Sequence, residues 1–128
     1  MNIEYTEIDG RKLAIVKLTG IFNLDATIRL PATLKNDIPL DYEGNIIIDV
    51  SETEVKLANI DVNTIVENAT EMARYFLRKP HALLVAEAST DHSWNLFINA
   101  FEQNGILFRT FITIETAVEW LKDMDATD

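Results

Sequence analysis

A short stretch in the second half of the chain holds the side chains best able to do chemistry together. Ser89, Asp91 and His92 supply a hydroxyl, a carboxylate and an imidazole within four residues. Hydrolases use these groups as nucleophile, base and orienting acid, but assemble them across a fold and not from adjacent positions. Ser and Asp also cap helix N-termini. We therefore expect this stretch to cap a helix and to contact a ligand, and we do not expect an enzyme.

Asp49 is a second candidate because it lies near the end of an apolar run, residues 46–50. An acid at the end of a buried strand is where receiver domains carry their phosphoacceptor. A receiver also needs an acidic pair after its first strand and a lysine after its last. The chain has Asp9-Gly10 and Thr113-Ile114-Glu115 at those places. We predict that Asp49 is structural and bonded to backbone donors.

The sequence has no set of residues with the spacing of a metal site or a nucleotide site, so we expect no cofactor. His81 and His92 are well separated, and there is no cysteine to complete a transition-metal site. We expect His81, after Pro80, at the surface or at a sheet edge. The four glycines are scattered singly and form no phosphate-binding loop. Four carboxylates lack the regular spacing of a calcium loop: Glu52, Glu54, Asp61 and Glu67.

Hydrophobic periodicity predicts strands that alternate with helices. Asp9-Gly10 is a two-residue hairpin signal, and the continuous β-branched run at 46–50 is typical of a strand buried on both faces. The stretch 51–63 reads as a loop. The expected strands are 3–8, 12–19, 46–50, 81–88 and 106–112, and the expected helices are one from residue 24, one over 64–79, one after residue 91 and one over 114–124.

Local signals set several boundaries. Gly20 should end the second strand, and Pro31 should break or kink the first helix near Leu30. Thr64 and Glu67 form a capping box at the start of the second helix. Gly105 stands where a left-handed residue would end the third helix.

The predicted fold is a single α/β domain over residues 1–128. It has a mixed sheet of about five strands, an N-terminal antiparallel hairpin followed by βαβα units, and helices packed on the sheet. Ligands of such sheets bind at the carboxyl ends of the parallel strands. Those ends carry Asp49, Ser51, residues 88–92 and Thr113.

Charge and composition narrow the function classes. The 128 residues include 21 acidic and 11 basic side chains, a formal charge of −10, which repels phosphate backbones and anionic membranes. We expect no nucleic-acid partner. The longest apolar runs are too short to span a bilayer, and the start of the chain does not read as a signal peptide. With no cysteine, the sequence is consistent with a cytoplasmic protein.

Three segments together resemble the SpoIIAA-like proteins and the wider STAS superfamily. Residues 16–20 (Val-Lys-Leu-Thr-Gly) are similar to the second-strand motif of those proteins. Residues 45–51 (Asn-Ile-Ile-Ile-Asp-Val-Ser) are similar to their central strand. The last segment is a strand-end aromatic followed by a short helix that ends in Trp-Leu: Phe111, Ala117, Trp120 and Leu121.

The resemblance implies a regulatory or binding module. In the anti-sigma-antagonist branch, a Ser in an Asp-Ser-Ser-Gly turn is phosphorylated. The matching stretch here is Asp61-Val62-Asn63-Thr64, which keeps the acid but neither the following residues nor the Gly. Thr64 is the phosphorylation candidate by position, although its capping-box role also explains it.

Two functional hypotheses follow. The first is a module that engages a protein partner, or a second copy of itself as a homodimer, through residues 51–64 and 89–94. The alternative is a carrier or sensor of an apolar or amphipathic small molecule, because the SpoIIAA-like fold is similar in outline to lipid-carrying Sec14-type domains. Core packing is the expected role of most aromatic residues. The candidate contact residues are Asp49, Ser51, Asp61, Asn63, Thr64, Ser89, Asp91, His92 and Trp94.

Overall fold

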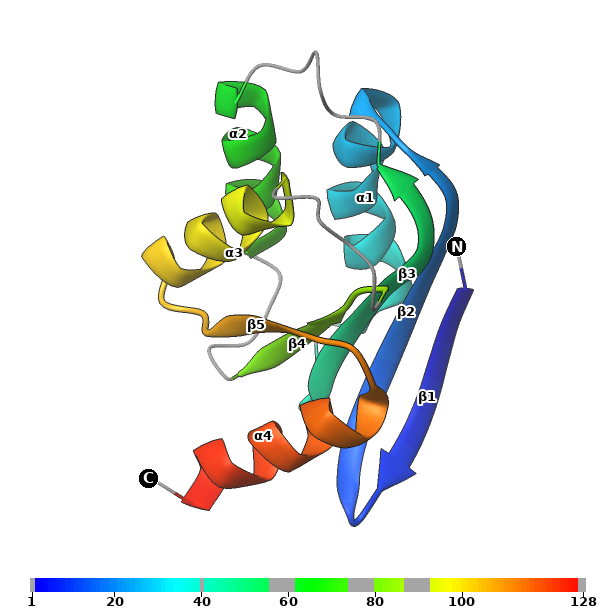
Figure 1. Ribbon diagram of the computed structural model, residues 1–128, viewed down its shortest axis with the longest axis vertical. Coiled ribbons are helices and arrows are strands. Elements are labelled where there is room, and N and C mark those ends of the chain that lie inside the picture. Colours follow the sequence, from blue (N-terminus) through cyan, green and yellow to red (C-terminus); the bar gives the residue numbers. More distant parts are fainter. Residues whose placement is uncertain (1, 40, 56–61, 74–79, 87–92, 127–128) are drawn as a thin grey trace.

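A computed structural model describes residues 2–39, 41–55, 62–73, 80–86 and 93–126 (Figure 1). Within these residues, five strands and four helices follow one another in the predicted order. The elements are β1 (Asn2–Ile8), β2 (Arg11–Phe22), α1 (Leu24–Asp37), β3 (Asn45–Val55), α2 (Val62–Ala73), β4 (His81–Leu84), α3 (Ser93–Gln103), β5 (Phe108–Phe111) and α4 (Ile114–Ala126).

The strands form one sheet in the order β1-β2-β3-β4-β5. β1 pairs with β2 antiparallel, and the other neighbours are parallel. Asp9 and Gly10 turn the hairpin with φ angles of 54° and 80°, which is why an Asp-Gly pair suits this turn. The predicted mixed sheet with an N-terminal hairpin is confirmed.

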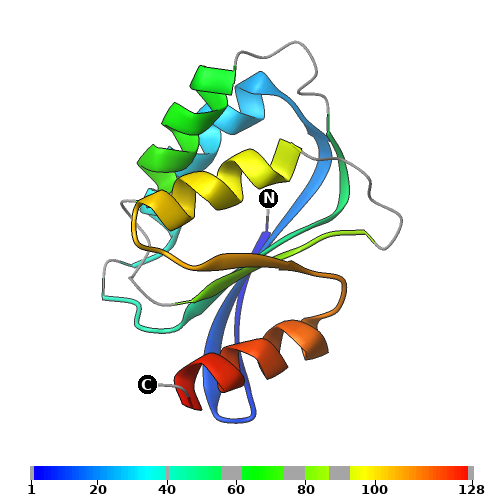
Figure 2. The same cartoon turned by 60° about the vertical axis from the view of Figure 1, so that its left-hand side comes forward.

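The helices divide between the two faces of the sheet, as Figure 2 shows: α1, α2 and α3 cover one face and α4 covers part of the other. Strand alternation explains how one run of isoleucines serves both faces. Ile46 and Ile48 pack in the core under α1–α3, and Ile47 packs in the core under α4. The strand was therefore correctly predicted to be buried on both sides.

The predicted end of the second strand at Gly20 is wrong, and the first helix continues past Pro31. β2 does not end at Gly20 but continues to Phe22, because Gly20 tolerates a φ of +85° and keeps its partner on β3. α1 does not break at Pro31, which lies inside the helix. Proline removes one helical hydrogen bond, but a helix interrupted there would not bury Leu30 and Leu34 in the core as α1 does.

β3 also extends beyond its predicted end at Val50, so residues 51–55 are strand and not loop. The pairing shifts by one residue on β3: Lys17 lies opposite Asp49, but Thr19 lies opposite Glu52. This is a β-bulge, which leaves backbone groups outside the regular ladder. Sequence periodicity does not reveal it.

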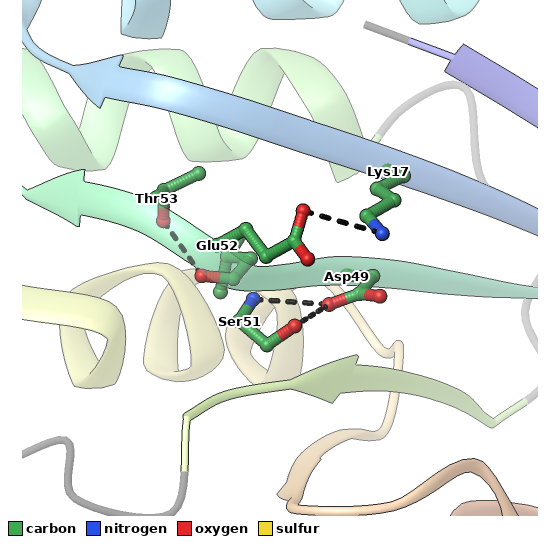
Figure 3. A network of polar contacts seen from close by, with 6 residues as sticks. Lys17, Asp49, Ser51, Glu52 and Thr53 are labelled. Carbon is green, nitrogen blue, oxygen red and sulfur yellow. Dashed lines mark hydrogen bonds and ion pairs between the residues drawn. The ribbon is translucent and has the colours of Figure 1, made fainter.

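Side chains of the bulge satisfy its backbone (Figure 3). Asp49 Oδ1 accepts hydrogen bonds from the Ser51 N–H at 3.0 Å and from the Ser51 hydroxyl at 2.6 Å. The Thr53 hydroxyl donates to the Val50 carbonyl at 2.7 Å. As predicted from the sequence, Asp49 is bonded to a backbone donor.

The predicted capping box at the start of α2 is wrong. The helix begins at Val62, so Thr64 is its third residue and not its N-cap. The Thr64 carbonyl accepts from the Asn68 side chain at 3.0 Å. The predicted end of this helix, and the predicted caps of α3, lie outside the described residues. Gly105 has a φ of 80° just after α3, as expected.

His81 is buried, not at the surface or a sheet edge as predicted. Its side chain is 0% exposed, and its Nδ1 accepts the Ile46 N–H at 2.9 Å. An accepting Nδ1 requires the neutral ring with its proton on Nε2. Beside it, Asn45 donates to the Pro80 carbonyl at 2.6 Å and accepts from Arg11 at 2.9 Å. These bonds join the beginnings of β2, β3 and β4.

We predict that Asp49→Ala destabilises the protein by about 1 kcal/mol, because the partly buried N–H of Ser51 in the bulge would lose its acceptor. Asp49→Asn keeps a side-chain oxygen in place and should cost less. Urea unfolding followed by circular dichroism measures both. Equal stability of Asp49→Ala and the wild type would show that the bulge does not need this side chain.

A second prediction concerns Tyr42, whose hydroxyl donates to the Asn45 carbonyl at 3.2 Å. Burial, and secondarily the neighbouring Tyr5, raises its pKa from 10.0 to about 12. Because the folded-state pKa lies above the unfolded one, the neutral phenol contributes stability that is complete below pH 10 and is lost as pH rises toward 12.

Absorbance at 295 nm should show one tyrosine that ionises late, and Tyr42→Phe should remove that late step. Tyr42→Phe should also flatten the fall of stability between pH 10 and 12. A wild-type titration in which all tyrosines ionise together near pH 10 would contradict the buried position of this hydroxyl.

Candidate functional site

The carboxyl ends of the parallel strands do not lie at one level. β4 ends at Leu84 and β5 at Phe111, which are paired with each other, and Leu84 also pairs with Asp49 in the middle of β3. β2 and β3 continue beyond this level to Phe22 and Val55. The edge of the sheet at which a ligand was expected is therefore stepped. The short strands β4 and β5 end first and form the low side of the step, and β2 and β3 form its high side.

A hollow of about 470 Å³ lies at the low side of the step. Ile112 lines it and is 55% exposed. The Val85 N–H donates to the Phe111 carbonyl at 2.9 Å, which holds the segment leaving β4 beside the end of β5. The described residues that line the hollow are Val85, Ala86, Thr110, Phe111, Ile112, Thr113 and Thr116. None of these side chains carries a carboxylate, an amine or an imidazole.

Two of the threonine hydroxyls at this hollow cap α4. Thr113 Oγ1 accepts the Thr116 N–H at 3.2 Å, and the Thr116 hydroxyl donates to the Thr113 carbonyl at 2.9 Å. The first turn of the helix also carries Glu115. The hydroxyls thus satisfy the start of a helix, and the surface offers apolar contact with polar groups at its margin.

Asp49 and Ser51 are the predicted site residues that the structure brings together. They stand on the strand beside an ion pair in which Lys17 Nζ lies 3.3 Å from Glu52 Oε2 (Figure 3). Both partners of that pair are largely exposed, so it contributes little to stability. The Ser51 hydroxyl donates to a carboxylate, which is a weak base for activating it. The arrangement supports the bulge and gives no reason to assign catalysis.

Trp94 lies in the core and not at the surface of the site. It is 6% exposed, and its ring packs 4.9 Å from that of Phe22. The apolar space around it measures only about 10 Å³, room for about one water molecule. A small apolar ligand would have to displace core side chains to enter.

The remaining predicted site residues are not brought together by the described structure. Asn63 is exposed and Thr64 is half-buried, both in the first turn of α2. Phosphorylation of Thr64 stays a prediction. Asp61, Ser89, Asp91 and His92 lie outside the described residues.

The hollow at Ile112 was not predicted from the sequence. Its two sides come from residues 85–86 and 110–116, which the pairing of β4 with β5 brings together. The expected strand 106–112 included Ile112, whereas β5 ends at Phe111, so the hydrophobic pattern gave no sign that Ile112 leaves the sheet. Spacing along the chain does not show that Val85 lies beside it.

The described residues hold neither a metal site nor a membrane span. Among them, no group of three or more His, Cys, Asp and Glu side chains could hold a metal ion. No helix in the described part of the chain is long and apolar enough to cross a membrane.

Comparison with known proteins bears on the fold. No family model matches the sequence, and no curated protein matches it. Among solved structures, the chain is similar to the crystal structure of an uncharacterized protein from the DUF3478 family, with a SpoIIAA-like fold, from Shewanella loihica PV-4. The TM-score is 0.59 at 15% identity, over 94% of this chain and 92% of that one. At this identity the similarity shows the fold alone: the chain has a SpoIIAA-like fold.

Proposed function

We propose that this protein is a non-enzymatic binding module that engages a protein partner at the carboxyl edge of its sheet. The observation that carries the proposal is Ile112, a large apolar side chain 55% exposed at a hollow of about 470 Å³. Exposed aliphatic side chains beside a concave, partly apolar surface are typical of protein contacts. A cytoplasmic location belongs to the same proposal.

The chemistry of the lining favours contact over catalysis. Val85, Ala86 and Phe111 supply apolar surface, and the threonines supply a polar margin, which is the usual composition of a protein interface. Acid–base catalysis needs a titratable group within reach of the substrate. The described lining has none.

The carrier hypothesis takes second place. A Sec14-like carrier needs an apolar cavity of the order of its ligand, about 300–1,000 Å³ for a drug-sized molecule. The apolar space beside Trp94 measures about 10 Å³. The hollow at Ile112 is larger, but hydroxyl groups form part of its lining.

The partner can be identified by photo-crosslinking from the hollow. With a benzophenone amino acid at position 112, we expect a covalent protein adduct in the cells that make this protein. The matched control is position 28, because Ile28 on α1 is 52% exposed but does not line the hollow. An adduct of twice the chain mass would identify a homodimer, and any other mass a different protein.

Ile112→Asp in the same cells should abolish capture from a benzophenone at position 116, whereas Ile28→Asp should not. Both variants should unfold at the wild-type urea concentration, because both side chains are exposed. Equal capture from positions 112 and 28, or capture that survives Ile112→Asp, would overturn the proposed surface.

A further inference from the structure

β1 forms a free edge of the sheet. It pairs with β2 along its whole length, from Asn2 opposite Lys17 to Ile8 opposite Arg11. Among the described residues, no strand pairs with its other side, and Figure 1 shows it at the margin of the molecule. The pairing of β1 with β2 has no register shift, so the edge is regular from end to end.

The hairpin turn determines which backbone groups of β1 face outward. Ile8 and Arg11 flank a two-residue turn, so they form a hydrogen-bonded pair. Because bonded and non-bonded pairs alternate along an antiparallel ladder, the N–H and C=O groups of Ile3, Tyr5 and Glu7 point away from β2. Such a row of backbone groups is a template for a strand of another chain.

β1 lacks the features that most often protect an edge. Exposed edges are commonly blunted by a lysine, a proline, a bulge or a very short strand. β1 has seven residues, Asn-Ile-Glu-Tyr-Thr-Glu-Ile, with none of these features. Its only charged side chains are Glu4 and Glu7, which are both exposed. They stand three residues apart, so each face of the sheet receives one carboxylate at this edge.

Both carboxylates are available to a strand that approaches this edge. Neither Glu4 nor Glu7 belongs to an ion pair within the described residues. Lys12 lies opposite Glu7 on β2 but forms no ion pair with it, and Lys17 pairs with Glu52 at 3.3 Å. An added strand would therefore lie directly against two carboxylates of β1 and no cation of β1. Opposite charges on neighbouring strands are favourable and like charges are unfavourable, so the edge favours a basic strand over a second copy of itself.

Tyr5 gives the edge an apolar contact between the two carboxylates. Its side chain is 50% exposed. The ring is held from within the molecule, because its hydroxyl donates to the Asp37 carbonyl at 2.9 Å and its centroid lies 5.6 Å from that of Tyr42 in an edge-to-face contact. A ring that is already held loses little conformational entropy when another side chain packs on it.

We propose that the outer edge of β1 binds an extended, basic segment of a partner protein by strand addition. The backbone of the segment pairs with Ile3, Tyr5 and Glu7. Its basic side chains lie opposite Glu4 and Glu7, and an apolar side chain packs against Tyr5. Main-chain bonds supply affinity in this mode, and alternate side chains supply specificity. This site goes beyond the proposed function, because β1 and the hollow at Ile112 lie at opposite edges of the sheet.

The test uses the full chain and a cyclic hairpin peptide in which one strand reads Lys-Thr-Val-Lys-Val. Paired antiparallel to β1, this strand places its lysines opposite Glu7 and Glu4 and its central valine opposite Tyr5. We expect the peptide to bind and to slow hydrogen exchange of the Ile3, Tyr5 and Glu7 amides, which face no other strand of the described structure. The Thr6 amide already bonds to β2 and should change much less. The acidic counterpart, Glu-Thr-Val-Glu-Val, should bind at least roughly fivefold more weakly.

A matched pair of double variants separates the local carboxylates from the charge of the whole chain. Glu4→Gln with Glu7→Gln should weaken binding of the basic peptide roughly fivefold, because two exposed charge pairs are lost. Glu67→Gln with Glu102→Gln removes two charges from exposed positions on α2 and α3, and binding should stay within about twofold. All four side chains are exposed, so both variants should unfold at the wild-type urea concentration.

Several results would overturn the proposal. Equal binding of the acidic peptide, or an equal effect of the two double variants, would refute selection by Glu4 and Glu7. Binding that does not slow exchange of the Ile3, Tyr5 and Glu7 amides would place the peptide elsewhere, and absence of binding would refute strand addition of a basic segment. Protection of these amides that grows with protein concentration alone would mean that a second copy occupies the edge. Capture at Ile112 is independent of all of them, so the two proposals fail separately.

Discussion

The extra residue in β3 determines which side chains face the core in the far half of the sheet. Without it, Thr19 would pair with Ser51, and every later partner would shift by one. Phe22, which is 3% exposed in the main core, would then lie opposite Glu54. A one-residue shift in register moves every side chain of a strand to the opposite face of the sheet. The bulge therefore keeps the Glu54 carboxylate away from the core. The Asp49 side chain holds the bulge by accepting two hydrogen bonds from Ser51.

Beyond the bulge, the strands of the sheet end at different levels. Because β3 continues past the end of β4, β2 and β3 form a two-stranded extension that the shorter strands do not follow. The low side of the resulting step exposes the hollow at Ile112, and the free edge of β1 lies at the opposite edge of the sheet. Their separation allows two contacts to be made independently.

Local chemistry made much of the fold predictable. The Asp9-Gly10 turn, the doubly buried isoleucines and the left-handed Gly105 each follow from constraints within a few residues. The features that local signals did not predict share a different cause. Pro31 inside a helix and a fully buried His81 are tolerated because distant residues pack against them or bond to them. No short window of sequence contains those partners.

The candidate site was predictable only in part, for the same reason. Asp49 and Ser51 could be placed together because they are two residues apart. The hollow at Ile112 depends on the β4–β5 pairing, and the free edge of β1 depends on the order of the strands. Both are properties of how the strands pair, which the hydrophobic pattern restricts but does not specify.

The register of β2 against β3 can be measured in solution, and it decides whether the bulge exists. Nuclear Overhauser contacts between backbone protons in solution report which residues lie opposite each other. We expect contacts of Lys17 with Asp49 and of Thr19 with Glu52. Contacts of Thr19 with Ser51 would mean that the strand has no bulge. In that case, the pairing of β2 with β3 beyond Lys17 would have to be rebuilt.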